Sequence, residues 1–391
     1  MPEGDRVLVR APNHLGELVL ALPALERAAE LWPGRPLVQL PGRLAPVLEM
    51  STASLEVLPL AGRHRFPGAV RSVRARSPDV GILLTPSFSS ALLLRLCGVP
   101  HRRGTDTDAR GWLLTDRVDR EPLLAGHRVR EYLALVEGAA GDAGPARSAA
   151  GPDEEREPPR PRLRPLEEAR RSWRAAARTV GIKPDAGGGT VGLVPGGRAS
   201  SRRWPAERWR ELAGRLLERG LRVRVFGGPD EEPLTRAVAG DRSGAVALGG
   251  RTDLAALAGG LAACDAVATN DTGPMHLADA LDRPLAAVWG AGDPDQTRPL
   301  SPAARLLGTL DLPCHPCLEE ACPRSGEGYR SPTAERECLR LVPVDRVERT
   351  VIELLEGGGR HGRADPPARA GGERRSRSGD DAFAGGTEET G

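Results

Sequence analysis

The chain has 391 residues, of which 39% are hydrophobic and 28% charged, and its formal net charge is +2. This composition predicts a soluble globular protein of about two domains, with no global electrostatic attraction to nucleic acid or to a membrane. No segment approaches the roughly 20 apolar residues that span a bilayer. Residues 1–13 lack the pattern of a secretory signal, so we expect a cytoplasmic protein with reduced or metal-bound cysteines.

Strand-like and helix-like segments alternate through the first part of the chain. We expect strands at residues 6–11, 36–40 and 79–85, and helices at residues 17–32 and 89–98. Such alternation favours a parallel sheet whose two faces are covered by helices. Residues 138–165 interrupt the pattern with glycine, proline and charged residues, which indicates a linker or a solvated insertion.

The alternation returns in the second part of the chain. Strands are expected at residues 190–195, 221–227, 266–269 and 284–290, and helices at residues 205–220, 253–264 and 342–357. The predicted domains are residues 1–165, which include the linker, and residues 166–341, followed by the helix and a disordered tail over residues 358–391. The predicted fold class is α/β, with two doubly wound domains facing a cleft at the carboxyl ends of their strands.

The stretch "NDTGPMHLADAL", residues 270–281, joins a predicted strand directly to a predicted helix. Pro274 fits the first helical position, and Asp271 or Thr272 could cap the helix from before it. The free N–H groups and the positive dipole end there suit a phosphate, while Asp271 suits sugar hydroxyls. The stretch therefore indicates a nucleotide-sugar site, although an ordinary strand-to-helix turn would have the same composition.

A second strand-to-helix junction, "VPGGRASSRRWPAERW", covers residues 194–209. Gly196 and Gly197 permit a close approach to the backbone, and Arg202 and Arg203 could bind a diphosphate. A solvated basic loop is the alternative interpretation.

A third junction, "APNHLGELVLALPAL", covers residues 11–25 after the first predicted strand. It places Gly16 and Glu17 at the start of a helix that faces the expected cleft. The Glu17 carboxylate could act there as a general base for a sugar hydroxyl. Alternatively, Glu17 is an acid that only complements the helix dipole in a first turn.

Together these three junctions resemble the bacterial lipopolysaccharide heptosyltransferases of glycosyltransferase family 9, and within them the heptosyltransferase II branch. The resemblance runs in order from about residue 6 to about residue 357. It implies the GT-B architecture, in which one Rossmann-like domain binds the acceptor and the second binds the donor. It also implies inverting transfer of heptose from ADP-L-glycero-D-manno-heptose to the inner core of lipopolysaccharide.

The resemblance implies a role for individual residues. Glu17 would be the catalytic base, Asp271 would contact heptose hydroxyls, and the helix that follows it would present its start to the diphosphate. His276 stands at the histidine of the family's motif, where it either binds or packs. The residues implied for the donor site are Gly16, Gly196, Gly197, Arg202, Asp271, Thr272, Gly273, Pro274, Met275 and His276.

Two positions depart from the family's usual pattern. The family usually has Gly-Asp where this chain has Gly16-Glu17, so the carboxylate is moved by about one C–C bond, which matters for a base that must reach a hydroxyl. The family usually has lysine where this chain has Arg202, which keeps the charge but changes the hydrogen-bonding geometry. Lys183 is the only lysine in the chain, and we interpret Arg202 as a substitution that retains diphosphate binding.

The implied acceptor is an anionic lipid A–core oligosaccharide. Residues 63–76 and residues 101–111 are rich in arginine, and both could hold its phosphates and carboxylates, unless they form a solvated helix face and loop. The resemblance thus places the protein at the cytoplasmic face of the inner membrane, in peripheral contact with it. We expect a monomer that uses no nucleic acid as partner.

Four of the six cysteines cluster between residues 314 and 338. Cys314 and Cys317 have the spacing of zinc ligands, and Cys322 and Cys338 could complete a structural zinc site, with free thiols as the leading alternative. No catalytic cofactor or catalytic metal is expected, because a cationic side chain and the helix dipole could stabilise the leaving diphosphate.

Other functional classes fit the sequence less well. A nicotinamide-dependent oxidoreductase would need G-x-G-x-x-G after the first strand, where this chain has the single glycine Gly16. A GT-B enzyme with another nucleotide-sugar donor remains an alternative. So does a non-catalytic glycan-binding relative, given the departures at Glu17 and Arg202.

Overall fold

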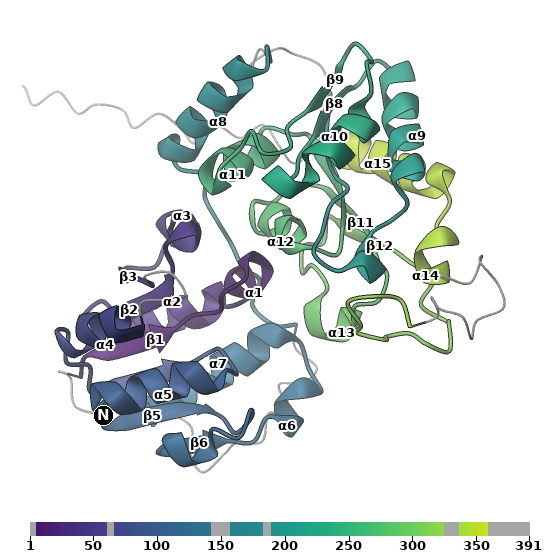
Figure 1. Cartoon of the computed structure of the whole chain (residues 1–391). Helices are drawn as coiled ribbons and strands as arrows, with labels where there is room; N and C mark the ends of the chain where they lie inside the picture. Colours follow the sequence, from purple (N-terminus) through teal and green to yellow (C-terminus); the bar gives the residue numbers. More distant parts are fainter. Residues whose placement is uncertain (1–4, 61–65, 142–156, 183–188, 324–335, 359–391) are drawn as a thin grey trace, which may run out of the picture.

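The computed structural model describes residues 5–60, 66–141, 157–182, 189–323 and 336–358, which form two α/β units, each built on a six-stranded sheet (Figure 1). The first sheet has the order β3-β2-β1-β4-β5-β6 and the second the order β12-β11-β10-β7-β8-β9, and the paired strands are parallel throughout. When each sheet is counted from its own first strand, both orders are the same. The predicted fold class of two doubly wound domains is therefore confirmed, and their switch points lie between β1 and β4 and between β7 and β10.

The first unit contains strands that are short and mostly buried. Its strands are β1 (Val7–Arg10), β2 (Leu37–Pro41), β3 (Glu56–Leu60), β4 (Val80–Leu83), β5 (His101–Thr105) and β6 (Asp116–Val118). Its helices are α1 (Leu15–Leu20), α2 (Leu22–Leu31), α3 (Ala45–Glu49), α4 (Phe66–Arg74), α5 (Phe88–Cys97), α6 (Glu121–Leu124) and α7 (Arg128–Ala139). The single helix expected at residues 17–32 is two helices that meet at Ala21, because Pro23 has no N–H group to continue the ladder.

The second unit repeats this plan. Its strands are β7 (Thr190–Val194), β8 (Arg222–Val225), β9 (Ala245–Ala247), β10 (Ala266–Asn270), β11 (Leu285–Val288) and β12 (Ala304–Leu307). Its helices are α8 (Glu167–Thr179), α9 (Ala206–Glu218), α10 (Glu232–Ala239), α11 (Leu254–Ala262), α12 (Gly273–Ala280), α13 (Pro294–Thr297), α14 (Glu337–Arg340) and α15 (Val344–Gly358).

The last described helix, α15, belongs to the core of the second unit. Val347 and Val351 are fully buried among side chains of β7, β10 and β11, in agreement with the amphipathic pattern of residues 342–357. The tail expected to be disordered lies outside the described residues from residue 359 onward. The domain limits at residues 165 and 341 stay predictions.

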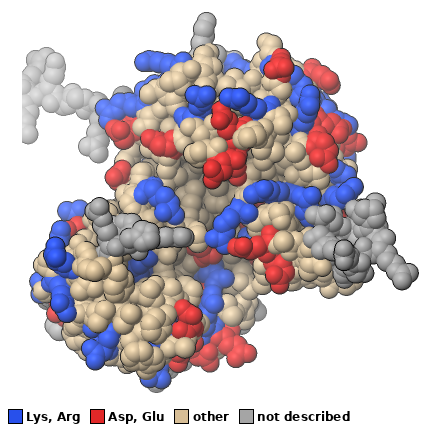
Figure 2. Space-filling model, in the orientation of Figure 1, with Lys and Arg blue, Asp and Glu red and all other residues tan. Residues whose placement is uncertain are grey.

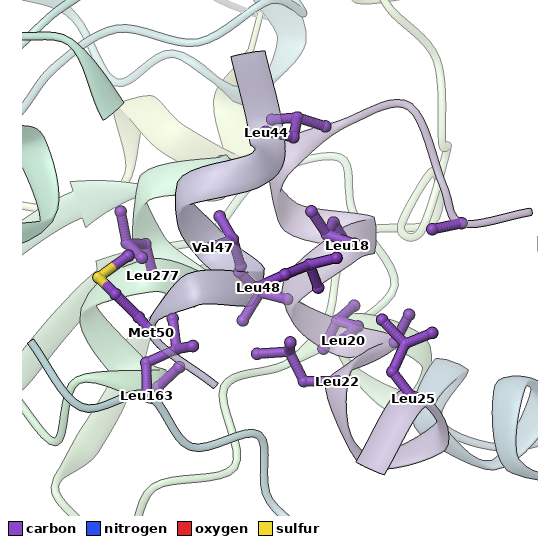
Figure 3. Packing of buried hydrophobic residues seen from close by; sticks show 14 of the residues in the cluster. Leu18, Leu20, Leu22, Leu25, Leu44, Val47, Leu48, Met50, Leu163 and Leu277 are labelled. Atoms are coloured by element: carbon purple, nitrogen blue, oxygen red, sulfur yellow. The ribbon is translucent and has the colours of Figure 1, made fainter. Parts of the chain in front are cut away.

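One continuous apolar core joins the two units. Leu18 on α1 and Leu48 on α3 pack in the same cluster as Leu277 on α12, and Met50 and Leu163 lie beside Leu277 (Figure 3). Figure 1 shows α1 directly beneath α12, so the helices that follow β1 and β10 meet where the two units face each other. Among the described residues, no helix combines the length and the apolar character needed to cross a membrane.

Candidate active site

Asn270 ties together the carboxyl ends of β7 and β10. Its side-chain amide donates hydrogen bonds to the carbonyl oxygens of Pro195 (2.7 Å) and Gly196 (3.0 Å), and its Oδ1 accepts one from the Trp204 N–H (3.0 Å). This fully buried amide therefore holds the glycine loop after β7 beside the motif after β10. The sequence analysis placed Asn270 only in a turn, because its role depends on neighbouring strands that the sequence alone does not pair.

Asp271 and Arg202 form an ion pair at this junction. Arg202 Nη1 lies 3.1 Å from Asp271 Oδ2, and the side chains are 32% and 3% exposed. Burial raises the pKa of Asp271, Arg202 opposes that shift, and the charge of Glu17 adds to it. In the described part of the chain, Arg202 Nε is buried without a hydrogen-bond partner, and Asp271 Oδ2 is buried with the ion pair to Arg202 but no contact of hydrogen-bond geometry. Buried polar atoms of this kind are usually satisfied, so a polar ligand would complete the pair.

The start of α12 has no side-chain cap. Thr272 occupies the N-cap position in an extended conformation, but its hydroxyl lies 3.4 Å from the Asn270 carbonyl oxygen and does not accept from the helix. Pro274 is the second helical residue rather than the first, which corrects the sequence-based placement by one position. The helix therefore keeps N–H groups and a positive dipole end at the carboxyl edge of the second sheet.

Met275 and His276 are both buried in the first turn of α12. Met275 is fully buried, and the ring of His276 packs against Gly16 of the first unit. Burial, with smaller contributions from His127 and Arg202, lowers the pKa of His276 to about 3, so the ring is neutral at neutral pH. Between binding and packing, the two alternatives for His276, this geometry favours packing.

Gly16 and Gly273 allow the two helix starts to touch. A methyl group added to Gly16 would lie 2.8 Å from His276 Cδ2, and one added to Gly273 would lie 3.0 Å from Leu15 Cβ. The first contact is closer than real side-chain carbons approach and the second is tighter than most, so both glycines permit the contact between α1 and α12. The glycines thus shape the boundary between the units, which the sequence motifs did not reveal.

The glycine loop after β7 is occupied by a carboxylate. Glu231 accepts hydrogen bonds from the N–H groups of Gly197 (2.7 Å) and Gly228 (2.8 Å), and it lies over Gly196, where a larger residue would displace the carboxylate. Gly197 has φ of +148° and lies against the methyl group of Thr272. The sequence analysis did not identify Glu231, because it lies 34 residues after Gly197 in the chain.

Glu17 lies on α1 opposite this pair, and its side chain is 37% exposed. Its Oε2 accepts a hydrogen bond from the Tyr132 hydroxyl and lies 4.0 Å from Arg128 Nε. Because Glu17 affects the pKa of Asp271, the two carboxylates lie close enough to interact across the boundary. The structure thus gathers Glu17 and the residues predicted for the donor site around the facing ends of α1 and α12.

The four clustered cysteines lie next to Ser201, the residue before Arg202. Cys314, Cys317, Cys322 and Cys338 line one small cavity of about 20 Å³, and Ser201 lines it too. The thiols are reduced, and the described residues contain no group of three His, Cys, Asp or Glu side chains arranged to hold a metal ion. Ser201 donates from its N–H (3.2 Å) to the Glu320 carbonyl oxygen and from its hydroxyl to that of Glu319, so the cysteine loop supports the residue next to Arg202.

The arginines predicted to bind the acceptor differ in how far they are exposed to solvent. Arg110 is fully buried, where it donates to the carbonyl oxygens of Thr85 and Thr105, and the expected acceptor contact is wrong for this residue. Residues 101–105 form β5 rather than a loop, because hydrogen bonds with β4 override their polar composition. Arg71 and Arg74 are exposed on α4.

Comparisons with known proteins show the family and the fold of the chain. The family model described as glycosyltransferase family 9 (heptosyltransferase) matches residues 68–326. Lipopolysaccharide heptosyltransferase 2 of Escherichia coli K12 is 31% identical over 324 residues, 77% of this chain and 87% of that relative. Lipooligosaccharide heptosyltransferase 2 of Haemophilus influenzae is 27% identical over 317 residues, 78% of this chain and 80% of that relative. The solved structure of E. coli ADP-heptose LPS heptosyltransferase II matches with a TM-score of 0.73 and 27% identity, covering 90% of this chain and 99% of that one.

Proposed function

Since the chain belongs to glycosyltransferase family 9, we propose that it transfers heptose from ADP-L-glycero-D-manno-heptose to the inner core of lipopolysaccharide. The similar E. coli proteins are a lipopolysaccharide heptosyltransferase 2 and an ADP-heptose LPS heptosyltransferase II. The observation that carries the proposal is the ion pair between half-buried Arg202 and buried Asp271, with unsatisfied polar atoms beside the uncapped start of α12. This arrangement suits a ligand that combines anionic phosphates with sugar hydroxyls.

In the proposed mechanism the acceptor hydroxyl displaces ADP directly. Glu17 removes the proton from that hydroxyl as its oxygen bonds to the anomeric carbon, while the bond from this carbon to the phosphate oxygen breaks. The electron pair of that bond leaves with ADP, and the anomeric configuration inverts. Arg202 and the dipole of α12 stabilise the negative charge that grows on the diphosphate.

The donor is proposed to bind through the second unit. Asp271 would accept hydrogen bonds from heptose hydroxyls, while Thr272, Gly273 and Pro274 would present the backbone of the α12 start to the diphosphate. Met275 and His276 would support that backbone from the core. Gly196 and Gly197 would let the nucleotide approach the loop after β7, and Gly16 would bring α1 close to the sugar.

The acceptor is proposed to bind through the first unit. Basic side chains gather along the boundary between the upper and lower halves of the molecule in Figure 2, and this suits an anionic core oligosaccharide. Arg71 and Arg74 would add contacts with phosphates of lipid A and the core. We therefore place the enzyme, as a monomer, in peripheral contact with the cytoplasmic face of the inner membrane, where this acceptor is presented.

The transfer is proposed to need no bound metal. The four clustered thiols have the residue types of a zinc site, but no three of them stand at ligand positions in the described chain, so no step is assigned to a metal. Their proposed role is to hold the loop that supports Ser201 and, through it, the Arg202 segment.

The test is a transfer assay on heptosylated Kdo–lipid A with a panel of ADP-, UDP- and GDP-sugars. The expected result is ADP release only with ADP-heptose and an acceptor mass that rises by one heptose. Release with another nucleotide-sugar would assign a different donor, and ADP binding without turnover would assign a non-catalytic glycan-binding protein. Glu17→Gln should bind ADP normally and lower kcat by about 100-fold or more, the contribution typical of a general base.

A further inference from the structure

Two side chains of α7 converge on one oxygen of Glu17. Arg128 and Tyr132 are four residues apart, so they lie on the same face of the helix. The Tyr132 hydroxyl donates to Glu17 Oε2, and Arg128 Nε lies 4.0 Å from the same atom. Within the described chain, Glu17 Oε1 has no such partner, so the carboxylate is held from one side only.

Both side chains are themselves fixed. Tyr132 is 3% exposed, and its pKa is raised well above the usual value by burial and by the Glu17 charge, so it remains a hydrogen-bond donor. Arg128 donates to Glu131, a buried carboxylate that also accepts from Arg120 (3.3 Å). Side chains locked in this way orient a partner group with little loss of entropy.

Arg128 also reaches the second unit. Its Nη2 donates to Gln296 Oε1 on α13 (3.0 Å), and the neighbouring His127 ring makes a 3.0 Å hydrogen bond through Nε2 with the Arg298 carbonyl oxygen. The His127 Nδ1 accepts from the Val129 N–H, so Nε2 carries the proton and donates to Arg298. The start of α7 is thus bound to the unit that would hold the donor.

We propose that Tyr132 and Arg128 are positioning residues that hold Glu17 Oε2, leave Oε1 for the acceptor hydroxyl, and link the base to the donor-binding unit through Gln296. The inference rests on the proposed role of Glu17 as the base. It also explains why this chain has glutamate at the position, since the added methylene lets the carboxylate reach Tyr132 on a neighbouring helix. Orientation of this kind affects the rate of the chemical step more than substrate binding.

The first test is Tyr132→Phe in the full-length enzyme. We expect kcat to fall about 10- to 100-fold, the effect of losing one hydrogen bond to a charged group. KM for donor and acceptor should change less than about threefold, because the buried Tyr132 hydroxyl is hydrogen-bonded to Glu17. A fall in kcat without a rise in KM is the result that separates a positioning role from a loss of substrate binding.

The second test is a double-mutant cycle with Glu17→Asp. The shorter side chain should lose the contact with Tyr132, so adding Tyr132→Phe to Glu17→Asp should lower kcat by less than about twofold further. Fully additive effects, or a Tyr132→Phe enzyme with the normal kcat, would overturn the inference. Retained activity in Glu17→Gln would instead overturn the base itself, so the two failures are distinguishable.

Gln296→Ala tests the link to the second unit without touching α7. We expect kcat to fall roughly three- to tenfold, because Arg128 loses its hydrogen bond to the second unit, while the donor KM is retained. Thr297→Ala is the matched control, since among the described residues the Thr297 hydroxyl hydrogen-bonds only to the Asp293 carbonyl oxygen of its own turn (3.3 Å). Equal kcat values in these two variants would remove Gln296 from the proposal.

Discussion

Replacement of Gly16 by alanine should destabilise the protein through the contact between α1 and α12. The added methyl group would lie 2.8 Å from His276 Cδ2 and 3.4 Å from Gly273 Cα. His276 is buried against the core and Gly273 is backbone, so neither can move away freely. Overpacking of a buried contact costs about 1–3 kcal/mol.

An opposing effect must be subtracted. Alanine favours a helix over glycine by about 1 kcal/mol, partly because glycine loses more entropy on folding. The expected net loss in the free energy of unfolding is therefore about 0–2 kcal/mol. Gly34→Ala is the matched control, because nothing lies within 4 Å of the methyl group there, and its stability should stay the same or rise slightly.

Chemical denaturation monitored by circular dichroism measures the free energy of unfolding of both variants, and the transfer assay measures their kcat. The clash moves α1 away from α12, so kcat of Gly16→Ala should fall while Gly34→Ala keeps full activity. Combining Gly16→Ala with His276→Ala should relieve the clash, giving a coupling energy of about 1–3 kcal/mol. A Gly16→Ala protein as stable as its Gly34→Ala counterpart would refute the close contact of the two helix starts.

Three further outcomes are expected. Arg202→Met should raise the donor KM roughly tenfold or more and leave the acceptor KM unchanged, while Arg202→Lys should retain most of the affinity; a rise in the acceptor KM alone would contradict the donor role. Burial lowers the pKa of His127 to about 4 from about 6.5 unfolded, so the unfolded chain binds more protons between these values and stability is lost as the pH falls through them. His127→Gln should therefore remove up to about 3 kcal/mol of the pH dependence between pH 6.5 and pH 4 measured by denaturation, and an unchanged pH dependence would argue against a buried neutral ring. Elemental analysis of fresh, untagged protein should find no stoichiometric zinc or iron with all six thiols titratable, whereas one zinc per chain with four protected thiols would make the cysteine cluster a metal site.

The alternation of strands and helices was determined by the sequence. Buried strands such as Val7–Arg10 and Ala266–Asn270 are short apolar runs bounded by polar residues, and such runs are recognisable without partners. The junctions at Gly16, Gly196 and Asp271 were recognisable for the same reason, since each follows such a run and opens a helix. Because the carboxyl ends of parallel strands share one edge, these junctions could be predicted to lie together.

Polar strands were decided only by tertiary structure. Residues 101–105, His-Arg-Arg-Gly-Thr, show no apolar alternation, yet they form β5 because β4 offers a ladder of backbone partners. Arg110 likewise lies in a polar stretch typical of a surface loop. It is nevertheless buried, because its guanidinium N–H groups donate to the carbonyl oxygens of Thr85 and Thr105.

The partners of the candidate site residues also came only from the tertiary structure. Tyr132 is 115 residues from Glu17, and Gln296 is 168 residues from Arg128, so no local pattern connects them. Local sequence encodes which backbone can form a strand or a helix, because those preferences act between near neighbours. Which side chain meets a carboxylate across two units depends on how the sheets and helices pack, and that is a property of the whole chain.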